Sequence, residues 1–315
     1  MTAPSLSRTR SFVGDLRQVA SVRRIVLDDG PERGVAALAF STGGGLDFWV
    51  LADRAMDIGP LWHKGLPMAW QSPAGFRHPA LVDPEGDDGN GFGRGFSGFL
   101  MTCGLDHTRH PAQGRPQHGR LPFLPARITV YGENWDATEP HLYCEGEIVQ
   151  WRHGAEALRL VRRIEAPIGG ETLRIRDRVE NIGWAEQRHA LLYHINFGYP
   201  CIVPGAVVAL HGEAILGPLT APDGRAVPAA RSHALGGREG MCTLSSGTRA
   251  VALAFSGQTL PYLQVWHDPR PHAYVLAIEP CTSARPADGS LAIEPVLTAG
   301  ECREYALDLK FSGQP

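Results

Sequence analysis

The chain has 315 residues, of which 43% are hydrophobic and 20% charged, and its formal net charge is −3. This length and composition support a large buried core, and so small a charge argues against a nucleic-acid partner. No apolar run approaches the roughly 18 residues of a membrane span, and the N-terminus has no apolar stretch of signal-peptide length. We therefore expect a cytoplasmic protein that has no membrane partner.

Short runs of alternating apolar and polar residues recur along most of the chain, bounded by Gly, Pro, Asn and Asp. In chain order, the predicted strands are 22–28, 35–40, 46–51, 127–132, 142–150, 157–165, 172–181, 187–197, 207–211, 250–255, 262–267, 273–279 and 304–311. The best candidate for a helix is Leu6–Val19. Since a parallel sheet needs helices between its strands, the pattern predicts an all-β fold, a large antiparallel sandwich.

One long segment between predicted strands is polar and rich in glycine, Ala74–Gly93 (AGFRHPALVDPEGDDGNGFG). A loop of this length inside a compact domain is often functional. The alternative is a loop that is merely exposed on the surface. No internal repeat and no low-complexity linker divides the chain. We therefore expect a single domain over residues 1–315, in which residues 1–20 form an N-terminal extension.

The predicted strand Gln187–Phe197 carries a histidine among apolar residues. Its even-numbered residues share one face, so His194 should stand beside Leu192 and Asn196. Two interpretations are open. His194 is either a core histidine bonded to a backbone carbonyl, or a proton donor near the end of a strand in a cleft.

A carboxylate closes the apolar face of the predicted strand Ala273–Glu279. Glutamate is rarely buried without a partner, and burial would raise the pKa of Glu279 toward the range of a general base. The alternative is an exposed glutamate at a strand end. The preceding strand ends in Trp266, His267 and Asp268, which would reach the same rim if the two strands form a hairpin. An aromatic ring beside polar groups is typical of a sugar-binding surface, although Trp266 could equally belong to the core.

The segment 93–128 is rich in histidine and also contains Cys103. Cys103, His107 and His110 raise the question of zinc, but their spacing fits no standard zinc signature, and we expect no metal. His118, in the sequence QHG, is better interpreted as a substrate-binding histidine in a loop held by glycine. The six cysteines of the chain form no CxxC pair, and we expect free thiols.

Several segments, in this order, resemble the aldose 1-epimerase (galactose mutarotase) superfamily, and more narrowly its bacterial group of aldose-1-epimerase-like proteins with a domain of unknown function. They are RAMDIGPLWHKGLPMAWQSPAGF (54–76), RGFSGFLMTCGL (94–105), PQHGRLPFLPARI (116–128), YHINFGYP (193–200), YVLAIEPCT (274–282) and the closing LTAGECREYALDLKF (297–311). The resemblance implies a β-supersandwich of twisted antiparallel sheets with its site in a broad groove.

The resemblance also implies roles for single residues. It implies His194 as the catalytic acid, Glu279 as the base, His118 as a second active-site histidine and Arg94 as a contact to sugar hydroxyls. The other predicted substrate-binding residues are Trp266, His267, Asp268 and Asn196.

The chain also departs from the family's pattern. It has His-Ile-Asn-Phe-Gly at 194–198, where the family commonly has His-Thr-Tyr-Phe-Asn. The sequence AIEP occurs at 277–280 and again at 292–295, so Glu294 is a second candidate for the base. Glu279 is preferred because its strand follows VWHDP.

The implied activity is that of a mutarotase, which interconverts the α and β anomers of a small-molecule sugar. A base would take the proton of the anomeric hydroxyl, and an acid on the opposite side of the hemiacetal would protonate the ring oxygen. This chemistry needs no cofactor. One alternative is another acid–base reaction, such as an epimerisation, on a keto- or modified sugar. Another is a non-catalytic carbohydrate-binding protein. An edge strand could mediate a homodimer.

Overall fold

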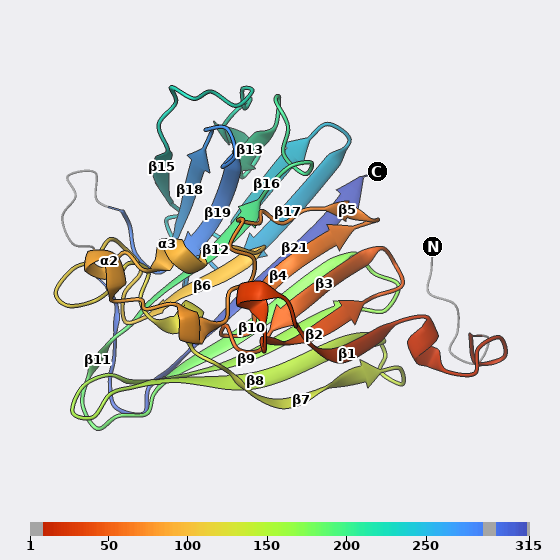
Figure 1. Ribbon diagram of the computed structural model, residues 1–315, viewed down its shortest axis with the longest axis horizontal. Coiled ribbons are helices and arrows are strands. Elements are labelled where there is room, and N and C mark those ends of the chain that lie inside the picture. Colours follow the sequence, from red (N-terminus) through yellow and green to blue (C-terminus); the bar gives the residue numbers. More distant parts are fainter. Residues whose placement is uncertain (1–8, 286–293, 314–315) are drawn as a thin grey trace.

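The structure is a computed structural model that describes residues 9–285 and 294–313. Two large antiparallel sheets form a sandwich (Figure 1). Within the described residues the first sheet has ten strands, in the order β1 (Ser21–Val26), β2 (Ala36–Ser41), β3 (Leu46–Leu51), β4 (Asp57–His63), β6 (Leu100–Leu105), β12 (Ala190–Phe197), β19 (Val275–Cys281), β18 (Tyr262–Asp268) and β15 (Ala229–Ala234), with β5 (Leu66–Pro67) paired to β4.

The second sheet has nine strands in the described part of the chain. Their order is β14 (Glu213–Leu216), β13 (Val207–Leu210), β16 (Gly240–Ser246), β17 (Arg249–Phe255), β21 (Cys302–Gly313), β10 (Thr172–Asn181), β9 (Ala157–Pro167), β8 (His141–Trp151) and β7 (Arg127–Asn134). Two short strands, β11 (Gln187–Arg188) and β20 (Val296–Leu297), pair with each other. The all-β antiparallel fold predicted from the sequence is confirmed.

Within the described residues, and apart from the helical residues 9 and 10, the helices are single turns. They are η1 (Leu16–Gln18), η2 (Gly30–Glu32), η3 (Pro79–Leu81), α2 (Gly86–Gly89), α3 (Phe92–Gly95) and η4 (Leu121–Phe123). None of the helices in the described part is long and apolar enough to cross a membrane.

The strands β12 and β19 are buried on both faces, whereas β10 alternates between buried and half-buried residues. One face of β12 contributes Tyr193 and Ile195 to the main core between the sheets. On the other face Leu192 packs in a smaller cluster with Phe92 and Phe123. The segment that contains α2, α3 and η4 therefore covers the outer face of the first sheet at its centre.

Every predicted strand overlaps an observed one, but some strands were missed. β4 and β6 are buried almost throughout, so their sequences do not alternate. The predicted strand 187–197 is divided at His189, whose ring bonds the Leu105 carbonyl at 3.1 Å and the Tyr305 hydroxyl at 2.5 Å. The six cysteines are free, as expected, and Cys302 is exposed.

The predicted helix Leu6–Val19 is not continuous over its described part: residues 9 and 10 are helical, and turns and bends separate them from the short η1. No residue of η1 is buried, and so short a helix is unstable without tertiary packing. Residues 1–8, part of that helix and of the predicted N-terminal extension, lie outside the described residues.

A buried ion pair joins the two sheets beneath β12. The Arg162 guanidinium of β9 donates to both oxygens of Asp177 of β10, at 2.9 and 2.6 Å, and to Asp57 of β4 at 3.2 Å. The Tyr193 hydroxyl donates to Asp177 at 2.8 Å. Burial alone would lower the pKa of Arg162, but the two carboxylates outweigh it and raise the pKa above its ordinary value.

We expect Arg162→Ala to lower the free energy of unfolding by about 3–5 kcal/mol, because it leaves two buried carboxylates without their cation. Tyr193→Phe, which removes one hydrogen bond, should cost about 1–2 kcal/mol. Chemical denaturation measures both.

The matched control is Arg127→Ala, whose guanidinium side chain is 80% exposed. Exposed arginines contribute within about 0.5 kcal/mol. Equal losses for Arg162→Ala and Arg127→Ala would show that the buried ion pair does not hold the sheets together.

Candidate active site

The two residues expected to act as acid and base lie on neighbouring strands. In the first sheet β12 pairs with β19 through Ile195 and Ile278, and β19 pairs with β18 through Glu279 and Gln264. Because side chains alternate along a strand, His194, Glu279 and Gln264 share the face that points away from the second sheet. The two faces predicted from the alternation are therefore the observed ones.

The carboxylate of Glu279 is completely buried. Its Oε1 lies 3.4 Å from His194 Nε2. Its Oε2 accepts a hydrogen bond from the Gln264 side-chain amide. Apart from the His194 contact, Oε1 has no hydrogen-bond partner among the described residues, so one oxygen of the carboxylate is held and the other is available for chemistry.

The orientation of the His194 ring is determined by Asn196. The Asn196 amide donates from Nδ2 to the Gly98 carbonyl at 3.0 Å, so its oxygen faces His194 Nδ1 at 2.5 Å. Since an amide oxygen only accepts, Nδ1 carries the proton and donates. This leaves Nε2 facing Glu279, where it can gain or lose a proton.

Aromatic rings cover the pair on the outer side. The ring centroid of His194 lies 5.1 Å from Phe96, 5.6 Å from His118, 5.8 Å from Trp266 and 6.3 Å from Phe92. Phe92 and Phe96 belong to the long segment that also contains α2 and α3, beside β6 and β12 in Figure 1. The predicted glycine-rich loop therefore covers the site and is not simply an exposed surface loop.

His118 lies within this cover. It adopts a left-handed backbone at φ 60°, and its Nδ1 donates to the Thr108 carbonyl at 2.9 Å. Burial, together with the neighbouring His194 and Arg109, holds the pKa of His118 well below its ordinary value. The ring is therefore neutral near pH 7, and its Nε2 is an acceptor.

Three other predicted residues have different partners. Arg94 is an exposed side chain whose guanidinium pairs with Asp87 at 2.5 and 2.8 Å. Asp268 shares the face of Trp266, but its carboxylate binds Arg270 at 2.6 Å. His267 points to the opposite face of β18, where its ring lies 5.7 Å from Tyr274. The structure brings none of these three to His194.

The second candidate base, Glu294, has a different hydrogen-bond partner from the His194–Glu279 pair. It accepts a hydrogen bond from the Ser283 hydroxyl at 3.0 Å, and burial raises its pKa. In the suspected zinc segment, the His107 ring bonds the His110 carbonyl at 2.7 Å. The described residues contain no group of three or more His, Cys, Asp and Glu side chains that could hold a metal ion.

Three contributors were not predicted from the sequence, Gln264, Phe92 and Phe96. Gln264 stands directly opposite Glu279 in the β18–β19 hairpin. Its role could have been found from the correct hairpin register, because opposite residues of an antiparallel pair share a face. No sequence pattern pointed to Phe96, because its contact with His194 depends on how a distant loop folds back onto the sheet.

We expect His118 to remain neutral, with its proton on Nδ1, at pH values below the ordinary histidine pKa of about 6.5, because burial disfavours the charged ring. Histidine ring ¹⁵N resonances followed from pH 8 to pH 5 measure this, and loss of the signal in His118→Gln assigns it. The unfolded chain takes up a proton near that pH and the folded chain does not, so the stability from neutral His118 falls as the pH decreases below about 6.5. A ring that protonates at or above 6.5 would contradict the geometry.

Comparisons with known proteins agree with this fold. A crystal structure from Klebsiella pneumoniae subsp. pneumoniae, described as a "putative aldose 1-epimerase", is 19% identical and covers 92% of this chain and 83% of its own, with a TM-score of 0.82. A galactose mutarotase-like protein from Clostridium acetobutylicum is 14% identical, covers 93% of this chain and 98% of its own, and has a TM-score of 0.64. No curated protein matches the chain.

The family comparison covers more than half of the sequence. Residues 32–220 match the model described as "Domain of unknown function (DUF4432)". That segment includes β12 with His194 and ends before β18 and β19. The expected resemblance is confirmed: the chain belongs to the DUF4432 family and has the galactose mutarotase-like β-sandwich fold.

Proposed function

We propose that the protein is a mutarotase that interconverts the α and β anomers of a sugar by general acid–base catalysis. The observation that carries the proposal is the contact between Glu279 Oε1 and His194 Nε2, 3.4 Å apart on one face of a sheet. A carboxylate and an imidazole in such proximity form a donor–acceptor pair of the kind that proton transfer requires.

The positions of the pair suit the two oxygens of a hemiacetal. The anomeric hydroxyl and the ring oxygen are bonded to the same carbon, so the base and the acid that serve them must be close neighbours. From the sequence we expect the two groups on opposite sides of the hemiacetal. Their direct contact instead favours an arrangement in which both approach the anomeric carbon from one side.

The reaction follows from these positions. Glu279 Oε1 takes the proton of the anomeric hydroxyl, and protonated His194 gives the Nε2 proton to the ring oxygen. The bond between the anomeric carbon and the ring oxygen breaks, leaving an aldehyde and a free hydroxyl. Rotation about the C1–C2 bond presents the other face of the aldehyde. The protons then return by the reverse steps as the ring closes.

The surrounding side chains tune and orient the pair. Gln264 holds one oxygen of Glu279, and Asn196 holds the Nδ1–H of His194, so neither catalytic group can rotate away. Orientation of this kind is a large part of such catalysis. Trp266 and the neutral His118 adjoin His194, and they supply an aromatic face and a hydrogen-bond acceptor for the sugar.

We expect Glu279→Gln and His194→Ala each to reduce the rate of anomer exchange by about 10²–10⁴-fold, because each removes one proton-transfer group. NMR magnetisation transfer measures the exchange over a panel of hexoses, pentoses, deoxysugars and sugar phosphates. The comparison is made on variants whose circular dichroism matches the wild type.

Glu294→Gln is the matched control, since it neutralises the second candidate base outside the pair. It should leave the exchange rate within about twofold of the wild type, because the group is not required for proton transfer. Loss of exchange in Glu294→Gln but not in Glu279→Gln would move the base to Glu294. No acceleration of exchange by the wild-type protein with any sugar would refute the proposal.

A further inference from the structure

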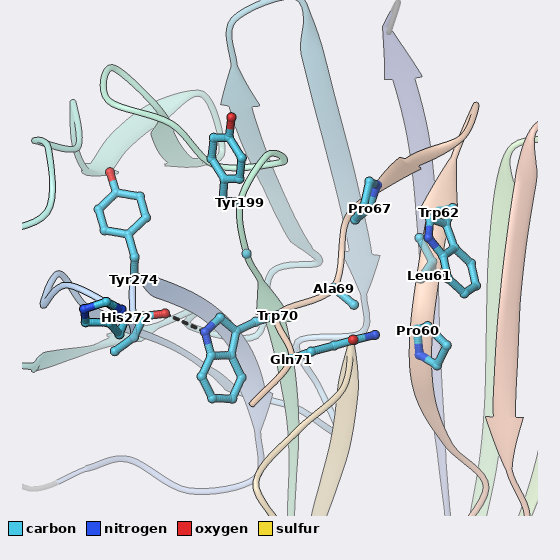
Figure 2. A pocket seen from close by; sticks show the side chains of 12 residues that line it. Pro60, Leu61, Trp62, Pro67, Ala69, Trp70, Gln71, Tyr199, His272 and Tyr274 are labelled. Atoms are coloured by element: carbon cyan, nitrogen blue, oxygen red, sulfur yellow. Dashed lines mark hydrogen bonds between the residues drawn. The ribbon is translucent and has the colours of Figure 1, made fainter. Parts of the chain in front are cut away.

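A hollow opens at the first sheet between β4 and the segments that follow β12 and precede β19. Its volume is about 420 Å³, within the range of roughly 300–1,000 Å³ found for small-molecule sites. Figure 2 shows its aromatic side chains, with Gln71 extending between Trp70 and Pro60. The lining includes Trp62, Trp70, Gln71, Tyr199, His272 and Tyr274.

This hollow adjoins the His194 site through one pair of rings. The indole of Trp70 lines the hollow and stacks on Phe96 with centroids 5.0 Å apart. Phe96 in turn contacts His194 at 5.1 Å. Tyr199, on another wall, lies two residues after the end of the strand β12 that carries His194. The Trp70–Phe96 stack therefore lies between the hollow and His194, and Tyr199 of the hollow closely follows the strand that carries His194.

The lining combines aromatic faces with unused polar groups. Within the described part of the chain, the Gln71 amide, the Tyr199 hydroxyl and the His272 ring have no hydrogen-bond partner, and each stands at the hollow. Tyr199 is 76% exposed, so its ring faces solvent. Apolar ring faces and free donors and acceptors together match a ligand with C–H faces and hydroxyl groups, which is the chemistry of a sugar ring.

The wall made by residues 272–274 is held in place. The Trp70 indole N–H donates to the Ala273 carbonyl at 2.5 Å, as drawn in Figure 2, and the Tyr274 hydroxyl donates to the Thr220 carbonyl at 2.6 Å. His272 and Tyr274 have φ of 66° and 33°, a left-handed region that such residues rarely adopt. Strained backbone of this kind is concentrated at ligand sites, and it persists only where surrounding contacts enforce it.

We propose that this hollow is a second sugar subsite and that the substrate is a reducing disaccharide. The inference rests on the proposed mutarotase function for the first ring only. Mutarotation needs a free anomeric hydroxyl at the Glu279–His194 pair, so a second ring can be attached only through another hydroxyl of the first. That second ring packs against Trp62, Trp70 and Tyr199, and its hydroxyls bind Gln71 and His272.

The test compares two reducing disaccharides, cellobiose and lactose, with glucose and galactose. NMR magnetisation transfer gives kcat/KM for anomer exchange with wild type, Tyr199→Ala and Gln71→Ala. Both substituted side chains are exposed, so the variants should fold. We expect kcat/KM for the better disaccharide to fall about tenfold in Tyr199→Ala, the equivalent of roughly one aromatic contact, and severalfold in Gln71→Ala. Exchange of the monosaccharides should change by less than about twofold, because they do not reach the hollow.

The matched control is Tyr131→Ala, a partly exposed tyrosine on β7 of the other sheet, which should change neither rate. Binding of the same sugars to Glu279→Gln, followed by tryptophan fluorescence, is independent of catalysis. Tighter binding of a disaccharide than of its monosaccharides, weakened in the Tyr199→Ala background, supports the subsite even if no exchange is seen and the mutarotase proposal fails. Equal losses for monosaccharides and disaccharides, or no preference for either disaccharide in exchange and binding, would overturn the second subsite.

Discussion

The buried pair of Arg162 and Asp177 is the interaction on which the rest of the structure depends. Both side chains lie in the second sheet, and they reach the first sheet through Asp57 and Tyr193. Asp57 in turn accepts two hydrogen bonds from the backbone N–H of Thr102 on β6, at 2.9 and 3.0 Å. Three neighbouring strands of the first sheet, β4, β6 and β12, are thus linked to one buried ion network. Tyr193 immediately precedes His194 in β12. The tyrosine that bonds the ion pair and the candidate acid therefore lie on opposite faces of the same strand.

Burial of β12 and β19 on both faces sets the chemistry of the site. In a poorly hydrated environment an ionised carboxylate is costly unless it is paired, and the polar contacts of Glu279 with described side chains are those with Gln264 and His194. The same environment strengthens each polar contact that the pair makes. The aromatic cover provided by Phe92, Phe96 and Trp266 therefore protects the pair from water and makes it responsive to a bound sugar. Trp70 extends this cover toward the hollow between β4 and the end of β12.

The bounds predicted for Thr172–Asn181, where buried and half-buried residues alternate, are those of β10, whereas β16, which also alternates, was missed. Prediction failed for β4 and β6, which are buried almost throughout and show little alternation, although the equally buried β12 and β19 were found. At the site, the alternation correctly placed Glu279 and His194 on their faces. It could not place Arg94, whose partner Asp87 lies in the same irregular segment. His267 was wrongly grouped with Trp266, although adjacent residues of a strand point to opposite faces.

The sequence by itself determined the local properties of this protein: the antiparallel strands, the faces of the two catalytic candidates and the family. These follow from a period of two and from short motifs, which depend on neighbouring residues only. The tertiary structure alone decided that His194 and Glu279 touch, that Gln264 holds Glu279, that the Gly98 carbonyl turns the Asn196 amide toward His194, and that a loop from residues 74–98 covers them. These features join segments that are 15 to 100 or more residues apart, as the 98-residue separation of Asn196 and Gly98 and the 15-residue separation of Gln264 and Glu279 illustrate. Such contacts depend on strand register and on packing between sheets, which local sequence patterns do not encode.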